Sequence, residues 1–158
     1  MTVCTFAGHR DGIMPKIEIY IAQKRNELLR ADTHFVFYSG GMGDFDKKCE
    51  SAVRTLKQRN SHLNIELVLV LPYMTNRLNT EKEYYESQYD DVIIPQELYD
   101  IHYKAAIKKR NRWMVDKSDW VMTYICRDFG GAYDTARYAR KKGKHVIDIA
   151  DDLSETKN

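Results

Sequence analysis

Polar side chains that suit an anionic ligand directly follow an apolar stretch near the start of this chain. In "CTFAGHR", His9 and Arg10 come immediately after Gly8. A guanidinium grips a phosphate or a carboxylate through two hydrogen bonds, and an imidazole, with an unperturbed pKa near 6.5, is a further donor. We predict that Arg10 contacts a phosphate and that His9 tightens binding below about pH 6.5. The alternative is a polar turn in which His9 only hydrogen-bonds its own loop.

Two more glycine-rich turns follow apolar stretches later in the chain. They contain Gly40, Gly41 and Gly43 in one turn, and Gly130 and Gly131 in the other. Glycine lets a ligand approach the backbone closely, and a helix that begins after such a turn offers free N–H groups and a positive dipole end to a phosphate. The spacing matches neither GxxxxGK[ST] nor GxGxxG. Either these are turns only, or, as we predict, they join Gly8 in one binding site.

Arg110 and Asn111 fall on the apolar stripe of a helix predicted by "YKAAIKKRNRWMVDKSD". Arg110 lies three residues after Ile107 and four before Met114, which places it on the inner face. An inward arginine needs a partner, because an unpaired buried charge is costly. The partner is either a carboxylate of the protein, with Asp46 and Asp119 as candidates, or a phosphate or carboxylate of a ligand. We include Arg110 and Asn111 in the site and expect Lys109 to face solvent.

Acidic and sulfur-containing side chains near these turns have structural alternatives. Asp46 either caps a helix that begins at Lys47 or accepts hydrogen bonds from a ribose or base. Asp134 would repel a phosphate, so we expect it to point elsewhere, and we expect Cys126 to be a buried thiol. The five histidines show no metal-ligand spacing. We therefore predict no metal and no cofactor.

The elements that must position these residues alternate along the chain. The apolar patterns predict a mostly parallel sheet between helices, a three-layer α/β sandwich of the Rossmann-like kind. In such sheets ligands bind beyond the carboxyl ends of the strands, where the strand order reverses. We predict one domain over residues 1–150 and a polar tail over 151–158. The expected strands are 2–8, 34–40, 65–72, 90–95, 119–125 and 145–150, with helices from Pro15, from Lys47, over 98–117 and over 132–142, and one short helix within 73–90.

Composition limits the classes of partner. The chain has 158 residues, a formal net charge of +2 and three cysteines, with no apolar run long enough for a membrane span. An odd cysteine count without CxxC spacing favours a reduced, cytoplasmic protein over a disulfide framework. The basic run 137–145 ends a helix, where cations suit the dipole. We therefore expect neither a nucleic-acid nor a membrane partner, and homo-oligomerisation stays open.

Taken in order, four segments resemble the SLOG superfamily, the Rossmann-like group that contains the DprA-type and LOG-type proteins. They are "FAGHR", "SGGMGDFD", "LVLPYM" and "KRNRWMVDKSDWVMTYICRDFGGAYDTARYA". The chain is most similar to the small stand-alone YspA/YpsA-like branch. This resemblance implies a nucleotide, a nucleotide sugar or an NAD derivative held between the first-strand loop and the two glycine turns, with Thr135 among the ligand-binding residues.

The resemblance leaves the reaction open. LOG-type phosphoribohydrolases use the arginine of "RKxxM" and the glutamate of "PGGxGTxxE"; Arg110 in "RNRWM" matches the arginine, whereas Tyr138 occupies the place of the glutamate. The leading hypothesis is a nucleotide-binding protein, with a sensor as one role. The second hypothesis is an N-glycosidase or phosphoribohydrolase acting on nucleotides, in which Asp46 or Asp134 replaces the glutamate, and a carboxylate facing the pocket beside Arg110 would favour it. A ligand-free assembly protein, its pocket blocked by Tyr73 or Tyr133, is the third.

Overall fold

The computed structural model describes residues 1–9 and 32–150 of the chain. Arg10, the helix expected from Pro15 and the tail 151–158 lie outside the described residues.

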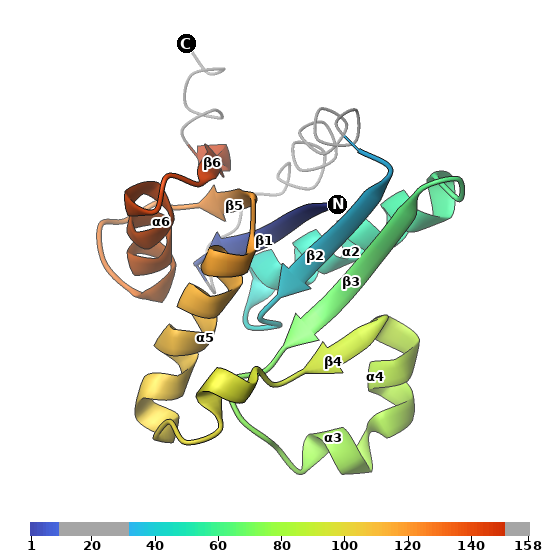
Figure 1. Ribbon diagram of the computed structural model, residues 1–158, viewed down its shortest axis with the longest axis horizontal. Helices are drawn as coiled ribbons and strands as arrows, with labels where there is room; N and C mark the ends of the chain where they lie inside the picture. Colours follow the sequence, from blue (N-terminus) through green and yellow to red (C-terminus); the bar gives the residue numbers. More distant parts are fainter. Residues whose placement is uncertain (10–31, 151–158) are drawn as a thin grey trace.

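Six strands form one sheet in which every neighbouring pair is parallel (Figure 1). Their order is β4-β3-β2-β1-β5-β6, so the chain moves outward from β1 to β4 and then crosses to β5 on the other side of β1. The strand order therefore reverses between β1 and β5, and all carboxyl ends lie at one edge. The predicted α/β fold with a parallel sheet is confirmed. The strands are β1 (Thr2–Gly8), β2 (His34–Ser39), β3 (Asn64–Val70), β4 (Asp91–Ile93), β5 (Trp120–Tyr124) and β6 (His145–Asp148).

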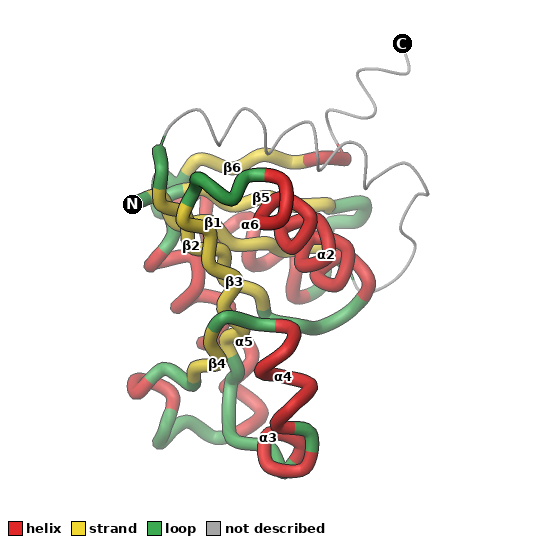
Figure 2. Tube along the Cα trace, turned by 90° about the vertical axis from the view of Figure 1, so that its right-hand side faces the viewer, coloured by secondary structure: helices red, strands yellow, loops and turns green. Residues whose placement is uncertain are grey.

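Helices cover both faces of the sheet. Side chains alternate along β1, so that Cys4 and Phe6 pack in the cluster that includes α2, whereas Val3 packs with Met114 of α5. The α6 helix lies beside α5 on that second face (Figure 1). Both views place α3 and α4 beside β4, at one end of the sheet (Figure 2). The helices are α2 (Asp44–Arg59), α3 (Arg77–Thr80), α4 (Lys82–Gln88), η1 (Gln96–Leu98), α5 (Tyr103–Lys117) and α6 (Gly131–Lys141).

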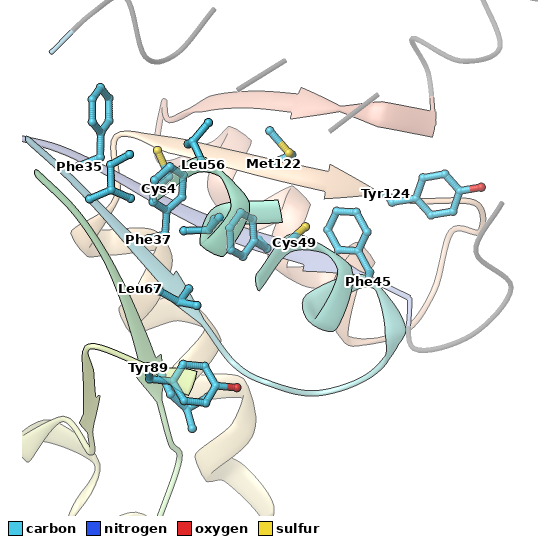
Figure 3. Packing of buried hydrophobic residues seen from close by; sticks show 14 of the residues in the cluster. Cys4, Phe35, Phe37, Phe45, Cys49, Leu56, Leu67, Tyr89, Met122 and Tyr124 are labelled. Carbon is cyan, nitrogen blue, oxygen red and sulfur yellow. The ribbon is translucent and has the colours of Figure 1, made fainter. Parts of the chain in front are cut away.

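The core explains why β1 ends on a glycine. Phe45, at the start of α2, is fully buried and stacks on Tyr124 with ring centroids 6.2 Å apart (Figure 3). A Cβ atom at Gly8 would lie 2.3 Å from two atoms of the Phe45 ring. The absence of a side chain at position 8 therefore serves the packing of α2 against β1, a reason that the short apolar stretch alone does not reveal.

Several predicted boundaries need correction. The helix after β2 begins at Asp44 rather than Lys47, because Gly43 is its N-cap with φ 89° and ψ 176°, a conformation essentially limited to glycine. The predicted helix over 98–117 is interrupted, since η1 ends at Leu98 and α5 begins after His102, whose Nδ1 accepts a hydrogen bond from the Lys104 N–H. Residues 73–90 contain two short helices instead of one.

Among residues 1–9 and 32–150, no helix combines the length and the apolar character that crossing a membrane requires.

Candidate functional site

A cavity of about 430 Å³ lies at the carboxyl ends of the strands, next to the reversal of strand order. Five parts of the chain line it: the end of β1, the β2–α2 loop with the first turn of α2, the middle of α5, the β5–α6 loop and the first turns of α6. The lining residues are Phe6, Ala7, Gly8, His9, Gly40, Met42, Asp46, Ile107, Arg110, Asn111, Met114, Arg127, Gly131, Ala132 and Thr135.

The structure brings most of the predicted site residues together at this cavity. Gly8, His9, Gly40, Asp46, Arg110, Asn111, Gly131 and Thr135 line it. The remaining described ones, Gly41, Gly43 and Gly130, do not line it and instead form the turns beside it. Arg10, which we expected to contact a phosphate, lies outside the described residues.

Arg110 reaches from α5 to the ends of two strands. Its side chain is only 2% exposed, and its Nη1 donates to the backbone carbonyls of Val70 (2.8 Å) and Gly40 (3.2 Å). Its Nε donates to Asn111 Oδ1 at 2.9 Å. The helical periodicity predicted this inward orientation correctly. The two carbonyls and Asn111 hold the guanidinium plane in one orientation at the cavity wall.

Of the two carboxylates considered for Arg110, one is near and one is distant in the fold. Asp119 Oδ2 accepts the Val3 N–H at 2.9 Å, at the start of β1, which is the opposite edge of the sheet from the cavity. Asp46 lines the cavity, and its charged form is favoured by Arg110. Asp119 is therefore excluded as the partner of Arg110, whereas Asp46 interacts with it electrostatically.

Asp46 combines a position at the start of α2 with an unusual ionisation. The alternative in which Asp46 caps the helix is wrong, because Gly43 is the N-cap and no side chain caps α2; Asp46 lies in the first turn, where its Oδ2 accepts the Met42 N–H at 3.0 Å. Burial raises the pKa of Asp46 from 3.8 to about 7, against the smaller opposing effects of the Met42 N–H and Arg110. A carboxyl group that changes its charge near neutral pH therefore faces the cavity.

A buried network that sequence reasoning missed supports the β2–α2 loop. Glu50 of α2 is 1% exposed; Ser39 donates to its Oε2 and Tyr89 to its Oε1, at 2.5 and 2.7 Å. The Gly41 N–H in turn donates to Ser39 Oγ at 3.1 Å. Because Gly40 lies between these tethered residues, the network fixes the carbonyl that accepts from Arg110.

The start of α6 presents backbone N–H groups beside the cavity. Gly130 is the N-cap with φ 95° and ψ 175°, and as a glycine it has no side chain to cap the helix. Gly131 and Ala132, the first two helical residues, line the cavity. Thr135 donates its hydroxyl to the Gly131 carbonyl at 2.8 Å, and its Oγ1 can still accept a hydrogen bond. The positive end of the α6 dipole therefore lies at the cavity wall.

Arg127 is the charged lining residue that sequence reasoning missed. It lies in the exposed β5–α6 loop, where no periodicity indicates the direction of a side chain. Its guanidinium lies 5.2 Å from the ring centroid of Phe129, which is 64% exposed. Its position in the sequence could have identified Arg127 as a site residue, because "RDFGG" follows a strand and precedes a glycine turn.

Other expectations are corrected or gain no support. Cys126 is exposed, not a buried thiol, because β5 ends at Tyr124 before reaching it. Asp134 is exposed and does not line the cavity, in agreement with the expectation that it points elsewhere, so it gives no support to an N-glycosidase that uses its carboxylate. Neither Tyr73 nor Tyr133 is a lining residue. Within the described part of the chain, no three His, Cys, Asp or Glu side chains form a group able to hold a metal ion.

Comparison with known proteins extends the description of the fold. No model of a protein family matches the sequence, and no curated protein matches it either. Among solved structures, DNA processing protein A from Helicobacter pylori is 19% identical with a TM-score of 0.63, and the match covers 98% of this chain and 72% of that one. DNA processing protein A from Streptococcus pneumoniae is 15% identical with a TM-score of 0.61, with 97% and 53% covered.

These similarities correct one expectation. The Helicobacter pylori structure describes a mode of single-stranded DNA binding. A protein of this fold thus binds nucleic acid, and our expectation that nucleic acid is not a partner, which rested on assigning a basic run to a helix end, is overturned. At these identities the comparison establishes the architecture: the chain has the Rossmann-like α/β fold seen in DNA processing protein A.

Proposed function

We propose that the cavity at the carboxyl edge binds a nucleoside phosphate. The observation that carries this proposal is the meeting of two guanidinium groups, Arg110 and Arg127, with the first turn of α6 in one cavity. Guanidinium groups and helix N-termini are the donors that proteins use for phosphate. The volume of about 430 Å³ lies within the range of small-molecule sites.

Different parts of the cavity suit different parts of the ligand. Arg127 and the amides of Gly131 and Ala132 suit the phosphate, whereas Asp46 and Asn111 offer hydrogen bonds to a ribose or base. Phe129, exposed beside Arg127, offers a face on which a base can stack. The proposal includes membership of the stand-alone YspA/YpsA-like branch, with a sensor of such a ligand as one role.

The phosphate can belong to a free nucleotide or to a nucleotide within a single strand. The second source gains support from the DNA processing protein of the same fold. Both sources present the same phosphate, ribose and base to the cavity, so separate arms of the experiments must distinguish them.

Thermal unfolding in the presence of nucleotides tests the proposal. A nucleotide at 100 times its dissociation constant adds about 2.7 kcal/mol, which for a chain of this length corresponds to a rise in Tm of about 5–10 °C. Arg127→Ala should weaken binding by about 1.5–3 kcal/mol and leave the Tm of the free protein nearly unchanged, because Arg127 is exposed. Lys109→Ala, on the exposed side of α5, is the matched control.

The result that contradicts the proposal is specific. If no nucleoside mono-, di- or triphosphate raises the Tm, or if Arg127→Ala responds like the wild type, the cavity is not a nucleoside-phosphate site.

Asp46 favours a second candidate, hydrolysis of an N-glycosidic bond. Its carboxyl group faces the cavity beside Arg110 and is protonated below about pH 7. As a general acid it would give its proton to the leaving base while the C1′–N bond breaks, and water would add its oxygen to C1′ and return a proton to Asp46. Release of free base from nucleoside monophosphates, measured by chromatography and lost in Asp46→Asn, is the expected result. Absence of free base with the wild type rejects this candidate.

The ionisation of Asp46 predicts a pH dependence of stability and binding. Because the pKa of Asp46 is raised from 3.8 to about 7 in the folded state, folding favours its neutral form. Its stabilising contribution is complete below about pH 4 and is lost as pH rises through about 7. Asp46→Asn should therefore be more stable than the wild type at pH 8, by up to about 4 kcal/mol. Urea unfolding at pH 5 and pH 8 measures the difference.

Phosphate binding should follow the same ionisation, since loss of the Asp46 charge removes a repulsion. Binding should tighten as pH falls through about 7, and Asp46→Asn should flatten the profile. Asp44→Asn, at an exposed position two residues earlier, should retain the wild-type profile.

His9, which is 5% exposed at the cavity wall, was predicted to cause a similar pH dependence of binding. If the pH dependence of binding is unchanged in Asp46→Asn but absent in His9→Ala, the histidine is its cause instead.

A further inference from the structure

The basic residues of the chain are concentrated in one pair of helices. Residues 103–117 and 131–144, which contain α5, α6 and the turn after α6, hold 11 of the 25 Lys and Arg residues but only 2 of the 23 Asp and Glu residues. The remainder of the chain is consequently net negative. The small net charge of +2 conceals this separation.

These cations share one surface because α5 and α6 pack side by side on the same face of the sheet (Figure 1). Val115 of α5 and Ala139 of α6 are fully buried in one cluster beneath them. Their basic side chains therefore project outward from a single layer. We call the following group the basic face: Lys108, Arg112, Arg137, Lys141, Lys142 and the half-buried Lys144.

No member of the basic face forms an ion pair with a carboxylate within the described residues. Asp116, the acidic residue of α5, uses its carboxylate to accept the Tyr138 hydroxyl at 2.7 Å and its backbone carbonyl to accept from Lys144. Cations elsewhere differ: Lys57 pairs with Asp90, and Arg77 pairs with Glu81. The basic face thus keeps its charge available for an external anion.

Two members of the face, from different elements, meet at one aromatic ring. The Arg112 guanidinium carbon lies 5.0 Å and the Lys142 Nζ lies 5.5 Å from the centroid of the Tyr138 ring. Cation–ring contacts lessen the repulsion between neighbouring cations without neutralising them. This arrangement holds several positive charges close together along the two helices.

The basic face adjoins the cavity. This holds on α5, where Lys108 and Arg112 directly follow the lining residues Ile107 and Asn111 and so flank the side of the helix that faces the cavity. An anion that enters the cavity and extends beyond it across α5 would therefore meet Lys108 and Arg112, and at Tyr138 the cations of α6.

From these observations we infer that the basic face binds the phosphate backbone of a single-stranded nucleic acid, one nucleotide of which occupies the cavity. The inference rests on the proposed nucleoside-phosphate site, because a base held in that cavity cannot be paired. The contacts of the face are to phosphates, so binding should depend strongly on salt and weakly on sequence.

Fluorescence anisotropy with a labelled 20-nucleotide single strand tests the inference. The double variant Arg112→Glu/Lys142→Glu should bind the strand about tenfold or more weakly, and the slope of log affinity against log salt should fall in magnitude by about 1.4, since each phosphate contact on a single strand contributes about 0.7. Binding of a mononucleotide, measured by thermal shift, should stay unchanged because neither residue lines the cavity.

The matched control is Arg59→Glu/Lys82→Glu, which makes the same change in charge at two exposed positions on α2 and α4. An equal loss in both double variants would show only a general charge effect and overturn the inference. So would duplex DNA binding as tightly as the single strand, or binding of anionic lipid vesicles or an acidic polypeptide in place of the strand. If mononucleotides do not bind but Arg112→Glu/Lys142→Glu alone loses the strand, the cavity proposal fails and the assignment of the face stands.

Discussion

Replacing Arg110 by alanine is expected to lower the free energy of unfolding by about 3 kcal/mol and to weaken nucleotide binding by about 2–5 kcal/mol. The side chain is 2% exposed and donates to the carbonyls of Val70 and Gly40, so its removal leaves two buried acceptors without that donor and opens a void. Urea unfolding measures the first effect and titration with a nucleotide the second.

Two variants control this experiment. Lys109→Ala should change both quantities little, because Lys109 is exposed on the same helix. Arg110→Lys retains a positive charge but loses the planar fork, in which Nη1 serves Val70 and Gly40 while Nε serves Asn111 from a second position, and should keep only part of the affinity. Equal effects of the alanine variants at positions 109 and 110 would contradict the orientation of α5.

Gly8→Ala is expected to destabilise the protein by about 3 kcal/mol, an unusually large effect for one added methyl group. The new Cβ would lie 2.3 Å from Cγ and Cδ1 of Phe45, a ring that is fully buried and stacked on Tyr124. The backbone at Gly8 pairs with Tyr124 in the neighbouring strand and so has little freedom to retreat. The free energy of unfolding in urea is the measurement.

Gly131→Ala is the informative control for Gly8→Ala. A Cβ at Gly131 would meet nothing within 4 Å, and the residue begins a helix, so this change should be neutral or stabilise by about 0.5 kcal/mol. In Phe45→Ala, which removes the obstructing ring, adding Gly8→Ala should cost much less than in the wild type. A mild effect of Gly8→Ala in the wild type would show that α2 can shift away from β1.

Sequence reasoning identified the residues whose position follows from a repeating pattern. Arg110 was placed at the site because the helical period puts it between Ile107 and Met114, and the structure agrees. The three glycine turns were placed at one edge because strand and helix alternate. These inferences succeed because periodicity and connection order are local properties of the chain.

Contacts between distant parts of the chain were not accessible in this way. The obstruction of Gly8 by Phe45 spans 37 positions, and Tyr89 reaches Glu50 across 39. The start of α2 was misplaced because the N-cap is a glycine, without the side chain that usually signals a cap. Arg127 was missed because a loop has no periodicity to orient its side chains.

The contact between Gly40 and Arg110 links two positions that lie 70 residues apart in sequence. A Cβ at position 40 would lie 3.1 Å from the guanidinium carbon and 3.2 Å from both terminal nitrogens, so even the smallest side chain there would require the arginine to shift, and a larger one would compete with it for space. Among related sequences, the residues at these two positions should consequently vary together. A relative with a bulky residue at the first position is expected to lack arginine at the second, and with it this pocket chemistry.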